Sequence, residues 1–171
     1  MHPTEWLRRM GLGSPARRLE WYPPFFSMRI RVLELADDWS RVRILLPLRH
    51  QNTNPGGIMF GGCMASLADP IPALACVQRF PDYSVWTRQL KVDFQREGRS
   101  EMELRFDFDP DLDARIRMEL EQEGRSDPWF KYAFFLPDGT QCAAVENCIA
   151  IRRTDFRANS SGALKPGGLQ V

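Results

Sequence analysis

The alternation of apolar and polar positions predicts a protein built mostly of strands. Residues 27–36 (SMRIRVLELA) and 41–49 (RVRILLPLR) alternate in the way that half-buried strands do, and the DDWS turn between them predicts a hairpin. Alternation returns at residues 83–95 and 100–109. A last hairpin is expected over residues 129–153, around a turn at PDG. The chain is therefore expected to contain six strands.

Two other segments have the pattern of helices. Over residues 63–77 small and apolar side chains occupy every face, which in a helix indicates burial on all sides. Pro70 and Pro72 each remove one intrahelical hydrogen bond, so a kink or break is expected just after Asp69. Residues 111–123 carry apolar side chains four apart and acids in the first turn, with a glycine as the stop, which predicts a surface helix.

The two ends of the chain differ from its middle. The first two dozen residues hold four prolines and are expected to form a short amphipathic helix at residues 6–10, followed by an extended segment. Residues 157–171 are small, polar and rich in glycine, which predicts a flexible tail. A chain of 171 residues is long enough for one domain with a core. We therefore interpret residues 1–25 as a lead-in, 26–156 as a single domain and 157–171 as a tail.

The order of these elements favours one architecture. Two strands, a buried helix, two strands, a surface helix and two strands fit an α+β fold in which an antiparallel sheet wraps around one apolar helix. The surface helix is an addition before the last hairpin.

Charge and composition exclude several classes of function. The 23 basic and 22 acidic residues nearly cancel, so no basic surface for nucleic acid is expected. No stretch reaches the roughly 18 apolar residues of a membrane span, and the N-terminus has no apolar secretory core, so we expect a cytoplasmic protein.

The cysteines and histidines are too few and too dispersed for a metal site. Four cysteines occur without a C-x-x-C pair and there are only two histidines, so we expect reduced thiols and no metal. The phosphate-binding loop and the dinucleotide fingerprint are absent, so we expect no cofactor. Chemistry, if present, must use carboxylates, hydroxyls, amides and the backbone.

Asp69 is the first candidate for such chemistry. It is the only residue ionised at neutral pH between Arg49 and Arg79. A carboxylate in so apolar a run is desolvated, which suits a general base or a nucleophile. The structural alternative is that Asp69 accepts hydrogen bonds from backbone amides where the prolines interrupt the helix.

Gly61 and Gly62 supply a second candidate feature. They begin the buried helix, where backbone amides have no intrahelical partner and can hold a developing oxyanion, although a plain turn before a helix is the alternative. Asp69 lies roughly 10 Å further along the same helix. One substrate carbonyl therefore cannot readily meet both within one chain, whereas a second copy of the helix could close the gap.

Five positions in the buried helix and in the loop before it resemble a known signature. Asn54, Gly57, Gly61, Gly62 and Asp69 stand as N-x-x-G-x-x-F-G-G-x(6)-D, which is similar to the signature of PaaI-like hotdog-fold acyl-CoA thioesterases. The resemblance extends over roughly residues 26–108. It implies the hotdog fold, and it implies a homo-oligomer, a dimer or a dimer of dimers, with active sites at the interface between protomers.

The resemblance also implies roles for single residues. Asp69 would be the base or nucleophile that acts on an acyl-CoA or related thioester, and the Gly61 amide would polarise a carbonyl in the partner's site. Asn54 would orient the carbonyl or the water. Thr87 matches a hydroxyl that helps to place the attacking water.

Three further residues are expected at the substrate. Gly62 would assist the Gly61 amide, and Gly57 belongs to the same signature. Phe60 stands where many relatives carry histidine, so any hydrogen bond of that histidine to substrate is lost here.

Two other functions remain open from the sequence. A binding protein that holds an acyl chain or a CoA conjugate without turnover is favoured by the apolar Phe60. A hydroxyacyl-thioester dehydratase would need a histidine, for which His50 is the candidate. Four arginines could bind CoA phosphates or simply be solvated: Arg79, Arg88, Arg96 and Arg99.

Overall fold

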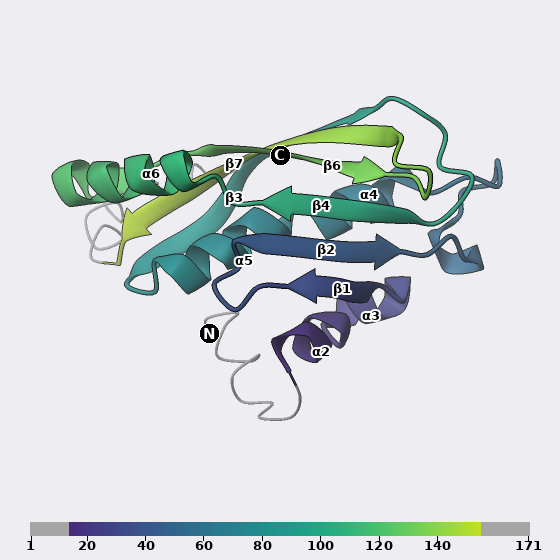
Figure 1. The fold of residues 1–171 in the computed structure, drawn as a ribbon, viewed down its shortest axis with the longest axis horizontal. Helices are drawn as coiled ribbons and strands as arrows, with labels where there is room; N and C mark the ends of the chain where they lie inside the picture. Colours follow the sequence, from purple (N-terminus) through teal and green to yellow (C-terminus); the bar gives the residue numbers. More distant parts are fainter. Residues whose placement is uncertain (1–13, 155–171) are drawn as a thin grey trace, which may run out of the picture.

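One antiparallel sheet forms the body of the molecule, whose computed structural model describes residues 14–154 (Figure 1). Its strands are β1 (Arg31–Leu35), β2 (Arg41–Leu46), β3 (Tyr83–Phe94), β4 (Met102–Asp107), β5 (Arg125–Ser126), β6 (Trp129–Phe135) and β7 (Gln141–Arg153). They are ordered β1-β2-β4-β6-β7-β3, and the short β5 pairs with β7. The six expected strands are all present, and only β5 was not predicted.

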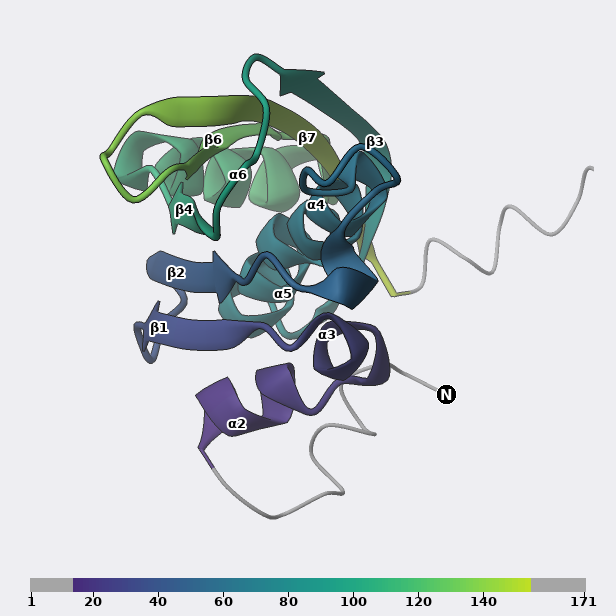
Figure 2. The same ribbon diagram turned by 90° about the vertical axis from the view of Figure 1, so that its right-hand side faces the viewer.

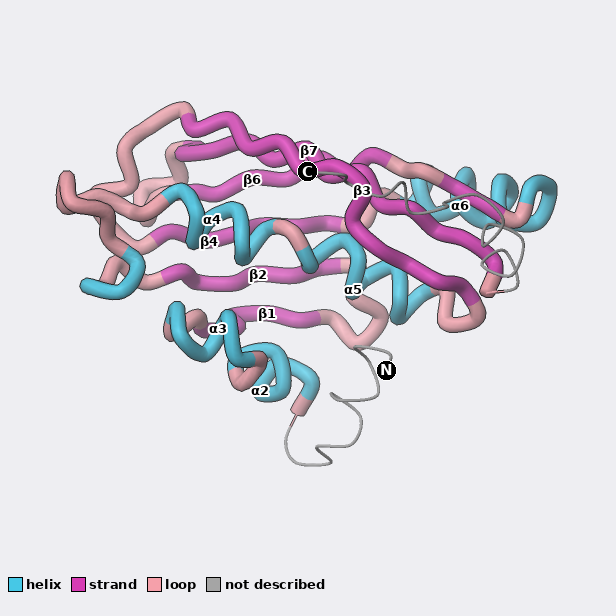
Figure 3. Tube along the Cα trace, turned by 180° about the vertical axis from the view of Figure 1, so that it is seen from behind, coloured by secondary structure: helices cyan, strands magenta, loops and turns pink. Residues whose placement is uncertain are grey.

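The sheet curls around a central helix, as expected (Figures 2 and 3). This helix consists of α4 (Gly61–Ala68) and α5 (Pro70–Arg79), so the predicted break at Asp69 is confirmed. Leu67, Ile71 and Ala75 are fully buried in the core that the helix forms with the sheet. The α+β architecture predicted from the order of elements is confirmed.

The N-terminal segment differs from the prediction. Residues 14–30 were expected to be extended and then to enter a strand, but they form α2 (Pro15–Glu20) and α3 (Pro23–Met28), and β1 begins only at Arg31. Pro15 and Pro23 occupy the first positions of these helices, where proline's missing amide is not needed and its fixed φ suits the helix. The expected helix at residues 6–10 and the tail at 157–171 lie outside the described residues.

The remaining elements are a 3-10 turn and a surface helix. The 3-10 turn η1 (His50–Asn52) follows β2, which ends before Pro47 because proline cannot donate to a strand ladder. The predicted surface helix is α6 (Pro110–Glu123), and it ends at Gly124 with a φ of 69°. That left-handed conformation is a normal helix stop for glycine.

The two edges of the sheet are unlike each other. At the β1 edge, α2 packs against the strand, and the Glu20 carboxylate accepts a hydrogen bond of 2.9 Å from the Val32 amide. At the other edge, β3 has 12 residues and pairs only with β7 among the residues that the structure describes. One edge is therefore covered and the other is open.

Candidate functional site

The break between α4 and α5 is stabilised by the sheet. Pro72 has no amide to donate to the carbonyl of Ala68, its normal partner four residues earlier. The Tyr132 hydroxyl on β6 replaces that amide and donates to the Ala68 oxygen at 2.9 Å. A strand side chain thus satisfies the backbone group that the proline leaves unpaired.

The carbonyl of Asp69 is held in a similar way by two strands. Asn147 Nδ2 on β7 donates to the Asp69 oxygen at 2.9 Å, and Thr87 Oγ1 on β3 donates to the same oxygen at 3.1 Å. Thr87, a residue that the sequence singled out, therefore does lie beside Asp69. The contact is to the backbone of Asp69, and it commits the only proton of the Thr87 hydroxyl.

Tyr132 and Asn147 form a buried polar pair beneath the break. Asn147 Nδ2 also lies 3.2 Å from the Tyr132 hydroxyl, and Asn147 is completely buried. Burial raises the pKa of Tyr132; the hydrogen bond from Asn147 opposes this, and the nearby Asp69 charge raises that pKa further. Tyr132 therefore stays protonated and remains a donor.

Only the amide nitrogen of Asn147 has hydrogen-bond partners among the described residues. Its Oδ1 is buried and has no hydrogen-bond partner among residues 14–154. An unpaired buried acceptor costs about 1–3 kcal/mol of stability. The chain thus tolerates a destabilising group in order to place Nδ2 at the Asp69 carbonyl.

The carboxylate of Asp69 itself is not engaged. The side chain is half-buried, and within residues 14–154 it makes no hydrogen bond or ion pair and does not cap α5. The structural alternative from the sequence, in which this carboxylate accepts backbone amides at the break, is therefore wrong. The group is held in place through its backbone while its oxygens stay available for a ligand.

The N-terminus of α4 presents free amides between two aromatic rings. Cys63 N donates to the Phe60 oxygen at 2.9 Å, while the amides of Gly61 and Gly62 have no acceptor among the described residues. A Cβ at Gly61 would lie 2.9 Å from the Phe94 ring, and one at Gly62 would collide with the Phe60 ring. Both rings are about half exposed. Glycine is therefore needed for the rings to lie this close to the first turn.

Cys63 lies in the same turn but is not an activated nucleophile. Burial raises the pKa of its thiol, which disfavours the reactive thiolate. All four cysteines are free and buried or half-buried, as predicted.

Asn54 and Gly57 belong to the loop that leads into α4. Asn54 Oδ1 accepts from the Gly56 amide at 2.9 Å, and the Asn54 carbonyl accepts from the Gly57 amide at 3.0 Å. Gly57 has a φ of 75°, which favours glycine. The side-chain oxygen of Asn54 is thus occupied by its own loop, and only its amide nitrogen is free to reach a ligand.

A neighbouring asparagine that the sequence did not single out anchors this loop. Asn52 is completely buried and donates to the carbonyls of Met28 and Pro47 at 2.7 and 2.8 Å. Its own carbonyl accepts from the Phe60 amide at 2.7 Å. Asn52 therefore fixes where α4 begins.

Most of the candidate phosphate-binding arginines are already paired. Arg79, Arg88 and Arg99 form ion pairs with carboxylates at 2.6–3.3 Å: Arg79 with Asp38 and Asp113, Arg88 with Asp127, and Arg99 with Glu97. Arg96 is exposed and forms no ion pair within residues 14–154. His50 is exposed at the start of η1, and no hydrogen bond or ion pair joins it to Asp69.

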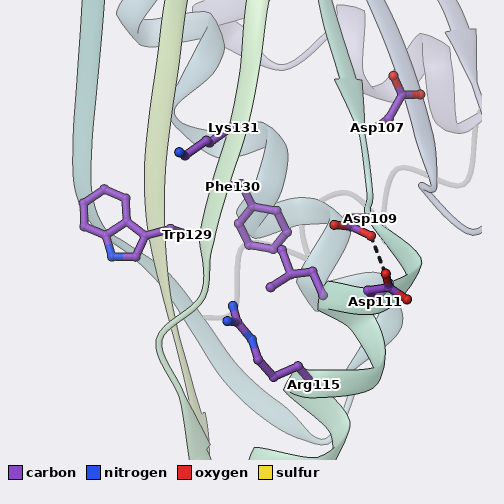
Figure 4. A pocket seen from close by; sticks show the side chains of 8 residues that line it. Asp107, Asp109, Asp111, Arg115, Trp129, Phe130 and Lys131 are labelled. Atoms are coloured by element: carbon purple, nitrogen blue, oxygen red, sulfur yellow. Dashed lines mark hydrogen bonds between the residues drawn. The ribbon is translucent and has the colours of Figure 1, made fainter.

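A surface groove of about 430 Å³ lies away from these residues, between the start of α6 and β6 (Figure 4). It is lined by Asp107, Asp109, Asp111, Leu112, Arg115, Trp129, Phe130 and Lys131. Its three carboxylates and two cations give no uniform charge that would suit phosphates. None of the predicted site residues lines it, so we do not assign the groove to the site.

The predicted residues thus fall into two clusters. Thr87 lies with Asp69, whereas Phe60 lies with Gly61 and Gly62 at the opposite end of α4. Tyr132 and Asn147 were missed. The sequence held a sign of Asn147, because this residue alternates with the buried Val145 and Ile149 on the inward face of its strand. An amide is unusual on such a face.

Three solved structures have a similar fold over 83–89% of this chain. PA5026 of Pseudomonas aeruginosa, a protein of unknown function called a probable thioesterase, has a TM-score of 0.70 at 17% identity, covering 89% of this chain and 97% of that one. Thioesterase HI1161 of Haemophilus influenzae has a TM-score of 0.63 at 13% identity, covering 83% of this chain and 93% of that one. The protein OLEI01261 of Chlorobaculum tepidum, which is of unknown function, has a TM-score of 0.67 at 12% identity, covering 89% of this chain and 97% of that one.

These similarities establish the fold. The antiparallel sheet around a central helix is the hotdog fold, as the sequence resemblance implied. No helix within residues 14–154 is long and apolar enough to span a membrane. No curated protein matches the sequence. The model of the family called domain of unknown function, DUF4442, matches residues 17–145, and the chain belongs to this family.

Proposed function

We propose that the protein hydrolyses acyl thioesters, with acyl-CoA as the substrate class, and that Asp69 is its base or nucleophile. The observation that carries the proposal is the Asp69 carboxylate, which is free of hydrogen bonds and ion pairs within residues 14–154 while its backbone is held by the sheet. The thioesterases of similar fold support the same chemistry.

The reaction needs few groups. Asp69 removes a proton from water, the hydroxide oxygen bonds to the thioester carbon, and the tetrahedral oxyanion accepts hydrogen bonds from the Gly61 and Gly62 amides. The carbon–sulfur bond then breaks, and the sulfur takes the proton from Asp69. The products are a free acid and a free thiol. As a nucleophile, Asp69 would instead form an anhydride that water hydrolyses.

Thr87 has a narrower role than the sequence implied. Its hydroxyl proton is committed to the Asp69 carbonyl, so the oxygen can only accept a hydrogen bond from the attacking water. Asn54 can offer only its amide nitrogen, because its oxygen binds the Gly56 amide. That nitrogen suits the thioester carbonyl, which accepts hydrogen bonds.

One complete site requires two chains. Gly61 and Asp69 lie at opposite ends of α4, so each carbonyl would be polarised by one protomer and attacked from the other. The open edge of β3 is the surface that supports such a pairing, because an unpaired strand of 12 residues readily adds a second strand.

Arg96 is our candidate for contact with the CoA phosphates. It lies two residues beyond Phe94, whose ring is next to Gly61, and no carboxylate is paired with it within the described residues. The other three arginines are held by ion pairs, which leaves them less able to bind phosphate.

The test is the release of free thiol from a panel of acyl-CoA substrates. Asp69→Asn is expected to lower kcat by at least about a hundredfold, since it removes the general base or nucleophile. Glu121→Gln, which neutralises an exposed carboxylate on α6, is the matched control and is expected to keep the wild-type rate. Equal rates for wild type and Asp69→Asn on the best substrate would refute the mechanism.

Binding without turnover is the second candidate function. The exposed Phe60 ring beside the free amides favours it, because the ring offers apolar area to an acyl chain and no catalytic group. Calorimetric binding of acyl-CoA with no thiol release across the panel would select this function.

A further inference from the structure

Three neighbouring strands converge on the two residues at the break of the central helix. Tyr132 on β6 bonds the Ala68 carbonyl, and Asn147 on β7 and Thr87 on β3 bond the Asp69 carbonyl. The strands β6, β7 and β3 are adjacent in the sheet. The backbone on both sides of the Asp69 peptide is therefore attached to a rigid layer rather than to the helix alone.

The pair formed by Tyr132 and Asn147 is not what stability alone would place there. Asn147 is completely buried with Oδ1 unpaired among the described residues, so an apolar side chain of similar size would pack without that cost. Its Nδ2 makes two contacts, to the Asp69 carbonyl and to the Tyr132 hydroxyl. The hydroxyl in turn points its proton at the Ala68 carbonyl.

We propose that Tyr132 and Asn147 are positioning residues for Asp69: they hold the two carbonyls at the helix break and thereby fix the backbone that carries the reacting carboxylate. This inference rests on the proposed function. Neither residue needs to touch the substrate. Their effect comes through geometry, since a displacement of about 1 Å at a reacting group can cost a hundredfold in rate.

Tyr132 is suited to this role over a wide pH range. Burial raises the pKa of its hydroxyl, so the hydroxyl keeps its proton and continues to donate to Ala68. Loss of one such hydrogen bond is expected to change kcat rather than KM, because both side chains are buried and act on the backbone of the helix break.

The experiment compares Tyr132→Phe and Asn147→Leu with Ser126→Ala, which removes another buried hydrogen-bonding hydroxyl, that to Glu119 in α6. We expect kcat for the best acyl-CoA to fall about tenfold in Tyr132→Phe and Asn147→Leu, with KM within about twofold of wild type. In Asn147→Leu the Tm is expected to stay within a few degrees of wild type, because removal of the unpaired Oδ1 offsets the loss of the two hydrogen bonds of Nδ2. Ser126→Ala is expected to keep the wild-type kcat.

Hydrogen exchange gives a readout that does not depend on turnover. Backbone amides of residues 64–76 are expected to exchange faster in Tyr132→Phe and Asn147→Leu, while those of α6 do not change. An active wild type with unchanged kcat in both variants would overturn the inference and leave the proposed function standing. If wild type hydrolyses no thioester, the proposed function fails; unchanged exchange in residues 64–76 would then overturn the positioning role as well, and faster exchange would support it.

Discussion

Proline is normally excluded from helix interiors, and Pro72 shows what such a residue can do in a buried helix. Its missing amide leaves the Ala68 carbonyl without an intrahelical partner, and Tyr132 takes that place. The sheet and the helix are thus joined by a hydrogen bond to a carbonyl that a regular helix would pair internally. At the scale of single residues, the prolines interrupt the helix, and Tyr132 and Asn147 hold the carbonyls at the interruption.

This interpretation predicts the effect of Pro72→Ala. Alanine restores an amide that competes with Tyr132 for the Ala68 carbonyl, so α4 and α5 would merge into one helix. We expect a Tm that is unchanged or a few degrees higher and a kcat that falls severalfold, measured by thermal unfolding and thiol release.

Pro70→Ala is the matched control for that variant. Its amide would bond the carbonyl of Ser66, which is exposed and receives no side-chain hydrogen bond among the described residues. A smaller loss of kcat is expected there. Equal kcat values in Pro72→Ala and wild type would show that the break does not serve the site.

The sequence was informative about the candidate site only where residue type and backbone position coincide. Asp69 and Gly61 could be found because a lone acid and a glycine pair stand out in an apolar run. Tyr132 could not, since an aromatic residue in an aromatic strand is an ordinary core residue. Its role depends on which carbonyl lies opposite its hydroxyl, and that is set by the packing of β6 on the helix.

At the scale of elements, the strands followed from their alternation and the central helix from its apolar residues on every face, but α2 and α3 could not be predicted in this way. Six-residue helices bury too little to leave a clear apolar stripe, and their prolines suggest extended chain unless they are placed at the first helical position. Strand β5 has two residues, which is too short for any alternation.

The attachment of α6 is expected to depend on pH. Burial alone would raise the pKa of Asp113, but hydrogen bonds from Arg79 and Arg117 outweigh it and lower this pKa. The unfolded chain therefore binds this proton more readily, so stability is present above the ordinary pKa and is lost as pH falls through the lowered one. We expect Tm to fall as the pH is lowered below the ordinary Asp pKa of about 3.9.

Asp113→Asn tests that dependence. It is expected to destabilise by about 1–3 kcal/mol at pH 7, since two charged hydrogen bonds are lost, and to flatten the acid limb of the Tm profile. Glu121→Gln, which neutralises an exposed acid on the same helix, is the control. A profile of Asp113→Asn parallel to that of wild type would contradict the assignment.

At the scale of the whole molecule, the proposed site is divided between protomers, and mixed dimers test this directly. Asp69→Asn removes one half of the site and Gly61→Val obstructs the other, so each homodimer is expected to be inactive. Refolding an equal mixture makes about half of the dimers mixed, and each contains one intact site of two. We expect about one quarter of the wild-type activity to return.

The control is an equal mixture of the same two proteins that have not exchanged subunits. Sedimentation or light scattering of wild type should give at least a dimer. A stable monomer with full activity, or exchanged mixtures as inactive as the separate variants, would refute a shared site.

The covered edge of the sheet has a consequence for how large such an assembly can grow. Strand-by-strand addition polymerises when every copy offers two acceptor edges, as in fibrils. Here Glu20 accepts a hydrogen bond from the Val32 amide and α2 packs against β1, so residues 14–154 of each copy offer one open strand edge, that of β3. Once the β3 strands of two copies have paired, both outer edges of the joined sheet are β1 strands, which α2 covers. The short helix α2 thus prevents further strand addition at the β1 edge. Glu20→Ala would be the first substitution to examine for aggregation.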